Sequence, residues 1–182
     1  MPYIADHKQK FADLEFNINN QDQLRRQANG GNSILFSYQP IEENLYIEKA
    51  IELYGDKAEF IDISKLLVKF IDIDGWDAFS ERYRDFIITP HIVFRSEDPD
   101  PDLFDMIISA IKQACEQDKT PFLIRSGCLY GTGIENVNIM EHKDVINLKH
   151  PLVIFYPSRV AEDNIYFLNF KPASKYRCTL VK

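Results

Sequence analysis

Long apolar runs and paired cysteines are both missing from this sequence, and each absence excludes a class of protein. No apolar run reaches the ~18 residues that a membrane-spanning helix needs. The N-terminal stretch MPYIADHKQK has no basic segment followed by an apolar core, which argues against a secretory signal. Cys115, Cys128 and Cys178 are odd in number and widely spaced, so they form neither a disulfide framework nor a CxxC metal pair. We therefore expect a cytoplasmic protein without a membrane segment.

Positive charge is also scarce. The chain has 21 Lys and Arg against 28 Asp and Glu, which gives a net charge of −7. Because an acidic surface repels a phosphate backbone, we expect no direct binding to nucleic acid. The four histidines show no HxxxH or HExxH spacing, and we expect no metal or other cofactor. Aromatic residues, in contrast, make up 13% of the chain, and such a surplus suits protein–protein interfaces.

Hydrophobic periodicity and turn residues divide the chain into alternating strands and helices. Apolar runs predict strands over 33–38, 58–63, 121–124, 152–156, 164–170 and 176–181. Helical spacing predicts helices over 8–30, 41–54, 65–70, 103–117 and 133–148, with Ser64 and Asp102 as N-caps. In the helix over 41–54, the residues expected to face the core are Leu45, Ile47, Ala50, Ile51 and Tyr54.

Residues 70–102 interrupt this alternation and are expected to form an irregular helical and loop insertion. Trp76, Phe79, Tyr83 and Phe86 recur at helical spacing. The segment 87–94 is β-branched but contains a proline, so it is expected to be an extended connection or an edge strand.

These elements predict an α/β fold. Strand, helix and strand over 33–63 follow one another through short connections, which implies a parallel pair. The length suits one domain over 1–182. We expect a single three-layer domain with a five- to six-stranded, mostly parallel sheet flanked by helices, in a P-loop/Rossmann-like topology.

A glycine-rich turn, RSGCLYGTG over 125–133, follows a predicted strand at the place where α/β proteins usually bind ligands. It has no Walker A motif, since no lysine follows before Lys143, and no GxGxxG fingerprint. Backbone N–H groups could still hold an anion, which would make the chain a small-molecule or nucleotide-binding module. The candidate ligand-binding residues are Gly127, Cys128, Gly131 and Gly133. The alternative is a tight strand-to-helix turn.

Candidate catalytic groups are few. Cys128 would need a base, and the nearest histidines in sequence are His142 and His150. Asp62 and Ser64 end a predicted strand and are a second option. The acidic clusters at 72–74 and 97–102 lack the remaining positions of a calcium loop and are expected to be solvated loops. We expect no catalytic residues and no enzymatic activity.

Six sequence blocks stand in a fixed order along the chain, namely SILFSYQP (33–40), FIDISKLL (60–67), FLIRSGCLY (122–130), PLVIFYP (151–157), FLNF (167–170) and KYR (175–177). This ordered set resembles the BrxB family of bacterial BREX anti-phage defence loci. The resemblance covers residues 10–181. Ser158 departs from the family's usual glycine, the turn after Tyr130 lacks its usual proline, and residues 70–102 match nothing in it.

The resemblance implies a non-catalytic component of a defence system. Such members are expected to bind a PglZ-like protein of the alkaline-phosphatase superfamily, and further BREX components are possible partners. Aromatic and arginine side chains dominate interface hot spots. On that basis the candidate partner-binding residues at strand ends are Tyr130, Arg159, Tyr176 and Arg177.

Overall fold

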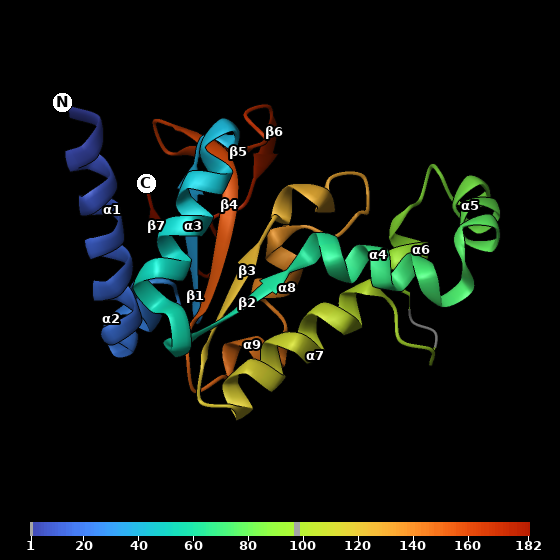
Figure 1. Ribbon diagram of the computed structural model, residues 1–182, viewed down its shortest axis with the longest axis horizontal. Coiled ribbons are helices and arrows are strands. Elements are labelled where there is room, and N and C mark those ends of the chain that lie inside the picture. The colour runs from blue at the N-terminus through green and yellow to red at the C-terminus, as the bar shows by residue number, and fades with distance from the viewer. Residues whose placement is uncertain (1, 97–98) are drawn as a thin grey trace.

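The computed structural model describes residues 2–96 and 99–182. Helices and strands alternate through most of the chain (Figure 1). The α-helices are α1 (Pro2–Asn19), α2 (Gln21–Gln27), α3 (Glu43–Tyr54), α4 (Ile63–Asp74), α5 (Trp76–Asp85), α6 (His91–Phe94), α7 (Leu103–Glu116), α8 (Asn136–Met140) and α9 (Lys143–Ile146). Short 3-10 helices are η1 (Pro40–Glu42), η2 (Gly55–Lys57) and η3 (Ser126–Leu129). The strands are β1 (Ser33–Tyr38), β2 (Ala58–Asp62), β3 (Thr120–Ile124), β4 (Leu152–Ala161), β5 (Asn164–Phe167), β6 (Lys171–Ala173) and β7 (Cys178–Val181).

One open sheet joins all seven strands of the described residues. Five of them run parallel in the order β2-β3-β4-β1-β7. The strand β4 continues beyond the carboxyl end of β1 and pairs antiparallel with β5, which pairs with β6. The mostly parallel sheet is confirmed, but the expected pairing of the first two strands is wrong, because β3 and β4 lie between β1 and β2.

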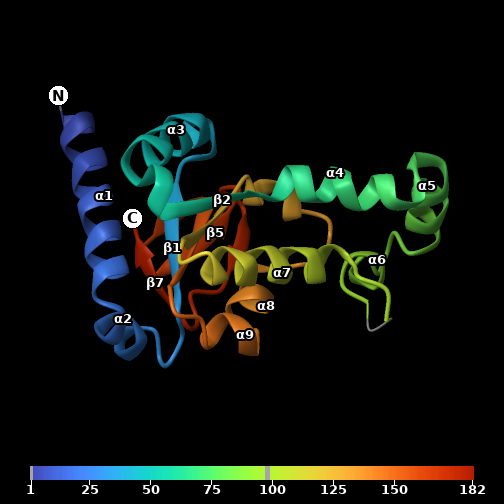
Figure 2. The same ribbon diagram turned by 60° about the horizontal axis from the view of Figure 1, so that its bottom comes forward.

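Helices cover both faces of the sheet, which confirms the three-layer α/β fold. Alternate residues of a strand point to opposite faces, and β1 shows this in Phe36 and Leu35. Phe36 belongs to a core beneath α1, α2 and α3, and Leu35 belongs to a core beneath α7, α8 and α9. Figure 2 shows α1 and α3 on one side of the strands and α7 on the other.

The carboxyl ends of β1 and β4 form the point where the chain changes faces. From β1 it continues into α3 on the first face, whereas β4 continues into β5, whose Ile165 and Phe167 belong to the core of the second face. Ligands of open α/β sheets bind at such switch points. The fold therefore directs attention to this edge.

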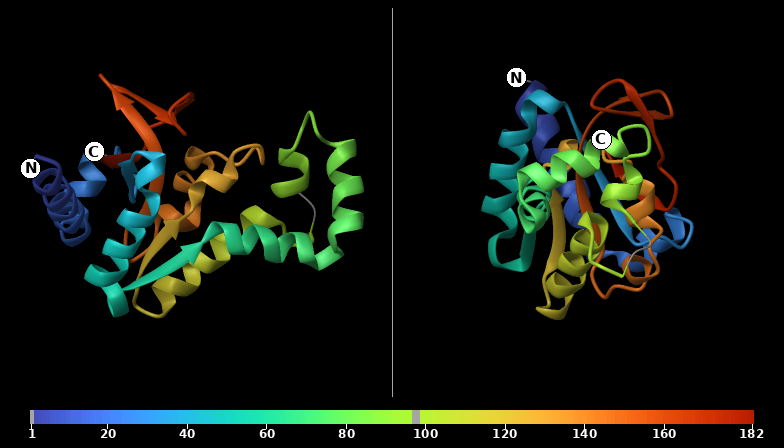
Figure 3. Two further views of the ribbon diagram at one scale, coloured as in Figure 1. Left: turned by 45° about the horizontal axis from the view of Figure 1, so that its top comes forward. Right: turned by 90° about the vertical axis from the view of Figure 1, so that its right-hand side faces the viewer.

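A helical projection, which we call the helical arm, extends from one edge of the sheet. It consists of α4, α5 and α6 and reaches away from the strands (Figure 3). Phe79 is its central side chain, with ring centroids 5.9 Å from Phe94, 6.0 Å from Tyr83 and 6.2 Å from Phe70. These rings join the arm to the core of the second face.

The helical arm corrects the prediction for residues 87–94. The segment is a turn followed by α6, and Pro90 is the N-cap of that helix. Proline is tolerated there because the first amide groups of a helix have no partner within the helix. Within the acidic cluster at 97–102, Glu97 and Asp98 lie outside the described residues.

Several predicted helices also have different bounds or caps. The helix over 8–30 is divided at Asn20 into α1 and α2, and the helix over 133–148 is divided into α8 and α9. Asp62, rather than Ser64, caps α4, because its carboxylate accepts from the backbone N–H of Ser64 at 3.0 Å. In α3 the side chains of Leu45 and Ile51 are exposed, contrary to expectation.

Candidate functional site

The glycine-rich turn lies at the carboxyl edge of the sheet, immediately after β3, and bonds mostly to itself. The N–H of Cys128 donates to the carbonyl of Arg125 at 3.3 Å, and that of Tyr130 donates to Gly127 at 3.2 Å. The N–H of Ile134 donates to the hydroxyl of Thr132 at 3.1 Å. Since these donors are already satisfied, they are not directed at a ligand.

Two of its glycines have structural roles. A Cβ on Gly133 would lie 2.8 Å from Cβ of His91 at the start of α6, and the residue has φ +76°. A Cβ added to Gly127 would lie 3.5 Å from Leu168 and 3.6 Å from Pro157, which are ordinary contact distances. Gly131 has φ +86° with open space around it. Anion binding at the turn stays a prediction, and the contacts favour the alternative of a tight structural turn.

Arg125 fills the carboxyl edge beside the turn. Its guanidinium lies 3.6 Å from the carboxylate of Glu43 and 3.6 Å from that of Asp62, and it donates to the side-chain oxygen of Asn44 at 3.3 Å. These partners come from α3 and the end of β2, so one cation joins three elements. Both carboxylates are therefore paired within the chain, and the cluster keeps one net negative charge.

The Cys128 thiol is not activated by this environment. Burial, with the nearby carboxylates of Asp62 and Glu43, raises its pKa to about 11, so the thiol is protonated at neutral pH. Within the described contacts, Nδ1 of His142 accepts from the Asp144 N–H, and His150 pairs with Asp118 at 2.8 Å. Neither histidine is bonded to the thiol, and enzymatic chemistry at Cys128 stays an untested prediction.

The four candidate partner-binding residues do not form one patch. Tyr130 is exposed and its ring meets that of Phe170 edge-on, with centroids 5.4 Å apart. Arg159 stacks over Tyr166 on the β4–β5 hairpin, beyond the carboxyl end of β1. Tyr176 and Arg177 precede β7 at the opposite, amino end of the sheet.

A crevice that the sequence did not reveal lies at the switch point between β1 and β4. It has a volume of about 460 Å³. At its wall, Nζ of Lys10 donates to the carbonyl of Ser37 at 2.8 Å and to the hydroxyl of Tyr46 at 3.4 Å. The buried hydroxyls of Ser37 and Ser158 lie 2.8 Å apart. Burial lowers the pKa of Lys10. Here too, the polar groups bond mainly to one another.

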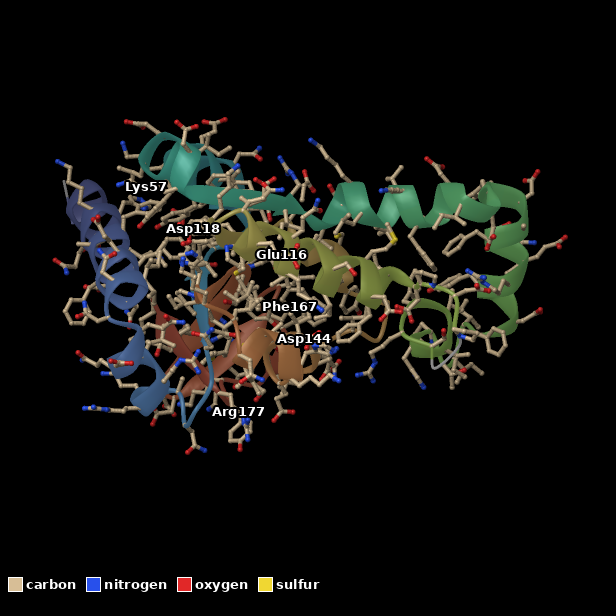
Figure 4. The ribbon with its side chains drawn as sticks, turned by 90° about the horizontal axis from the view of Figure 1, so that it is seen from below. Lys57, Glu116, Asp118, Asp144, Phe167 and Arg177 are labelled. Carbon is tan, nitrogen blue, oxygen red and sulfur yellow. The ribbon has the colours of Figure 1, made fainter. Side chains whose placement is uncertain are left out.

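A larger concavity, which we call the α1/α3 groove, runs between those two helices. It has a volume of about 1020 Å³. Apolar side chains from both helices line it, namely Phe11, Ala12, Ile18, Leu45, Tyr46, Leu53 and Tyr54. At its amino-edge end, Lys57 and Asp118 lie between α1 and α3 (Figure 4). Exposure of Leu45, which the helical pattern had placed in the core, is the consequence of this opening.

The helical arm carries the other large apolar surface. Its exposed side chains include Trp76 at 67% and Ile88 at 91% of their possible surface, and the rest of the set is Val68, Ile73, Phe86, Ile87 and Ile92. Phe86, Ile87 and Ile88 are consecutive, and a cluster of exposed apolar side chains is typical of a binding face. Apolar runs at 86–88 were the sequence signal for it.

Metal and membrane sites were not expected from the sequence, and the described residues add no candidates. They contain no group of three or more His, Cys, Asp or Glu side chains placed to hold a metal ion. No helix among them combines the length and hydrophobicity needed to cross a bilayer.

Comparison of the chain with protein-family models, with curated proteins and with solved structures finds no match. The resemblance to the BrxB family therefore rests on the ordered strand blocks alone.

Proposed function

We propose that this chain is a non-catalytic component of a BREX-type anti-phage defence system, where it acts in the cytoplasm as an adaptor that binds a PglZ-like partner. Other components of the system are further candidate partners. The ordered strand blocks support the family assignment, and the proposal contains no catalytic step.

The observation that carries the adaptor function is the exposed apolar surface of the helical arm. Seven large apolar side chains, from Val68 to Ile92, are exposed on α4, α5, α6 and the turn before α6. Burying such side chains contributes about 25 cal/mol for each Å² removed from water. Tryptophan is enriched among the residues that dominate interfaces, which makes Trp76 the first candidate anchor.

The chemistry of the carboxyl edge is consistent with an adaptor. Arg125 pairs with both Glu43 and Asp62, and the Cys128 thiol is protonated. Groups that an enzyme would direct at a substrate are engaged within the chain. This arrangement supports a role in binding a protein more than one in transforming a small molecule.

Binding to the purified PglZ-like protein, measured by calorimetry, tests the proposal. The double variant Ile87→Ser/Ile88→Ser should weaken binding at least tenfold, because it removes two exposed anchors from the arm. The matched control is Ile41→Ser, an equally exposed isoleucine on η1, away from the arm, which should change affinity less than twofold.

The candidate residues at strand ends enter the same experiment. Arg159→Glu and Arg177→Glu test opposite ends of the sheet. Tyr130→Ser tests the exposed pair with Phe170 near the turn. If the wild-type chain does not bind the partner at all, the adaptor proposal is wrong. Binding that is insensitive to the arm variants but lost with Tyr130→Ser would move the contact surface to the turn.

A further inference from the structure

Among the described residues, three strands pair with a single neighbour, and two of these three edges are protected. At one end of the parallel order, α1 and α2 pack against β7 (Figure 2). In the β5–β6 hairpin, β6 is three residues long and contains Pro172, which has no N–H to offer to a further strand. The third strand, β2, is five residues long, contains no proline and pairs with β3 in one continuous register. Its outer edge is the one without such protection.

Charged side chains commonly protect an open edge, but those of β2 are engaged within the chain. Glu59 pairs with Lys119 at 2.9 Å. Asp62 accepts from the backbone N–H of Ser64 at 3.0 Å and lies 3.6 Å from the guanidinium of Arg125. Each carboxylate thus has a cationic partner, and neither acts as an unpaired charge against an approaching strand.

A recess lies along this edge and has a volume of about 380 Å³. Residues 59–62 of β2, the first turn of α4 and one side of α7 form it. The α7 wall carries Ala110 and Ala114, whose small side chains leave the space open. It also carries Gln113 and Gln117, whose amide groups both donate and accept hydrogen bonds. The recess therefore offers polar groups beside an open strand.

We propose that β2 is a docking site for an extended segment of another protein, which adds to the sheet as one more strand. At about 3.3 Å per residue, five residues of this segment span about 16 Å along β2. The proposal does not depend on the adaptor function, because it concerns the edge of the sheet and not the exposed apolar side chains of the helical arm.

The backbone of β2 determines the form of the occupant. Every second residue of an edge strand directs its N–H and C=O groups away from the neighbouring strand. For residues 59–61, no backbone group outside β3 bonds to them within the described residues. The outward groups alternate in partial charge, which is complementary to a second extended backbone. A helix satisfies its own backbone groups and has none left for this edge, so the edge selects a strand.

The two faces of β2 indicate which side chains the segment carries. Phe60 packs against the core of the first face, whereas Ile61 belongs to the core of the second face. The recess lies on the second face, where Leu66, Ala110 and Ala114 line it. Since successive side chains of a strand alternate between faces, every second side chain of the segment meets this apolar lining. We expect apolar residues at those positions and polar residues between them.

A selection that requires no known partner provides the probe. The purified full chain is used to select from a phage-displayed library of random peptides of about 12 residues, and enriched peptides are synthesised for calorimetry. We expect peptides in which apolar and polar residues alternate. On binding, hydrogen exchange of the outward amides within residues 58–62 should slow at least tenfold, because they gain hydrogen-bond partners.

Methylation of the peptide's backbone nitrogens tests strand addition directly. At every second position it should weaken binding at least tenfold, because the amide loses its N–H and places a methyl group against β2. At the intervening positions the change should be less than twofold. A helical or irregular ligand would not show this period of two.

Matched variants of α7 locate the binding. Ala110→Trp fills the recess and should weaken the selected peptides at least tenfold. The control is Ser109→Trp, an exposed neighbour outside the recess, which should change affinity less than twofold. Urea unfolding checks that both variants are folded. The methylated peptides are measured with the wild-type chain, so they give a result even if Ala110→Trp does not fold.

Several results would overturn the proposal. They are the absence of any enriched peptide, methylation effects without a period of two, and a folded Ala110→Trp variant that binds as tightly as the wild type. Sedimentation of the chain alone tests a further alternative, because a dimer with slowed exchange over 58–62 would make a second copy the occupant. The adaptor test uses the PglZ-like protein and the isoleucines of the arm, so either proposal can fail without the other.

Discussion

At the carboxyl edge of the sheet Arg125, Asp62 and Glu43 lie against one another, whereas on the helical arm Trp76 and Ile88 face solvent. The first region satisfies its polar groups within the chain. The second leaves large apolar side chains exposed to solvent, although Phe79 packs its interior and contacts the ring of Trp76. In an α/β protein that edge is the usual ligand site, whereas the proposed adaptor function assigns recognition to the projection.

The largest expected effect concerns the interior of the helical arm. Phe79→Ala removes a buried ring that contacts Phe70, Tyr83 and Phe94, which should destabilise the arm by about 3 kcal/mol. Hydrogen exchange should rise over residues 67–95 while the strands stay protected, because the arm can open locally. The control is Trp76→Ala, an exposed position expected to cost under about 1 kcal/mol. Unchanged exchange in Phe79→Ala would show that the arm is not held by this ring cluster.

The glycine-rich turn of the carboxyl edge meets the helical arm where Gly133 lies against His91 of α6, and substitutions of the turn glycines test this contact. Gly133→Ala should cost about 3 kcal/mol, since a new Cβ both meets His91 at 2.8 Å and adopts positive φ. Gly131→Ala has the same backbone strain without the clash, so about 1 kcal/mol is expected. Gly127→Ala should lie within about 0.5 kcal/mol, because its contacts are ordinary. Urea unfolding measures all three, and equal costs for Gly133→Ala and Gly131→Ala would contradict the role given to His91.

The ion cluster of the carboxyl edge should contribute less. Arg125→Met leaves Glu43 and Asp62 without their shared cation, and we expect a loss of about 1 kcal/mol, reduced by the partial exposure of the guanidinium. The exposed pair of Lys49 and Glu52 provides the comparison, and Lys49→Met should change stability by less than about 0.5 kcal/mol. Added salt should reduce the difference in free energy of unfolding between the two variants. If Arg125→Met leaves the free energy of unfolding unchanged, the ion pairs at this edge contribute less than their distances indicate.

The smallest effect concerns Cys128, whose ionisation changes the stability only at alkaline pH. Its folded-state pKa of about 11 lies above the ordinary value of 9.0, so the protonated thiol favours the folded state below pH 9 and that contribution is lost as pH rises through 11. Alkylation by iodoacetamide in a Cys115→Ser/Cys178→Ser background should rise about tenfold per pH unit up to about pH 11. An inflection below pH 9 would reveal an activated thiol and reopen the enzymatic interpretation.

Patterns of local origin were well predicted from the sequence. The strand over 33–38 has the predicted bounds, and Asp102 caps α7 through a capping box. Both signals, the apolar run of Ile34, Leu35 and Phe36 and an Asp before a helical stripe, act within a few residues. The prediction of a single helix over 133–148 was wrong, because the apolar spacing gives no sign that His142 begins a new helix. Ser64 was chosen as a cap by residue type, although the Asp62 carboxylate, a stronger acceptor, lies two residues earlier.

The candidate sites divide in the same way. The sequence identified the turn over 125–133 as a feature of the sheet edge, which the structure places there. It did not identify the α1/α3 groove, since Leu45 looks like a core residue of an amphipathic helix. Nor did the sequence indicate that Lys10 donates a hydrogen bond to Ser37, which lies 27 residues away in the chain. Only packing between separate elements creates these sites.

By itself the sequence determined the alternation of strands and helices, and hence a parallel α/β sheet, because periodicity and turn chemistry are properties of neighbouring residues. Tertiary structure decided the strand order, the opening between α1 and α3, and how far the helical arm extends from the sheet. These depend on how far each crossover carries the chain and on which apolar faces find a partner. No local pattern encodes that outcome, because the energy of burial is realised only between segments distant in sequence.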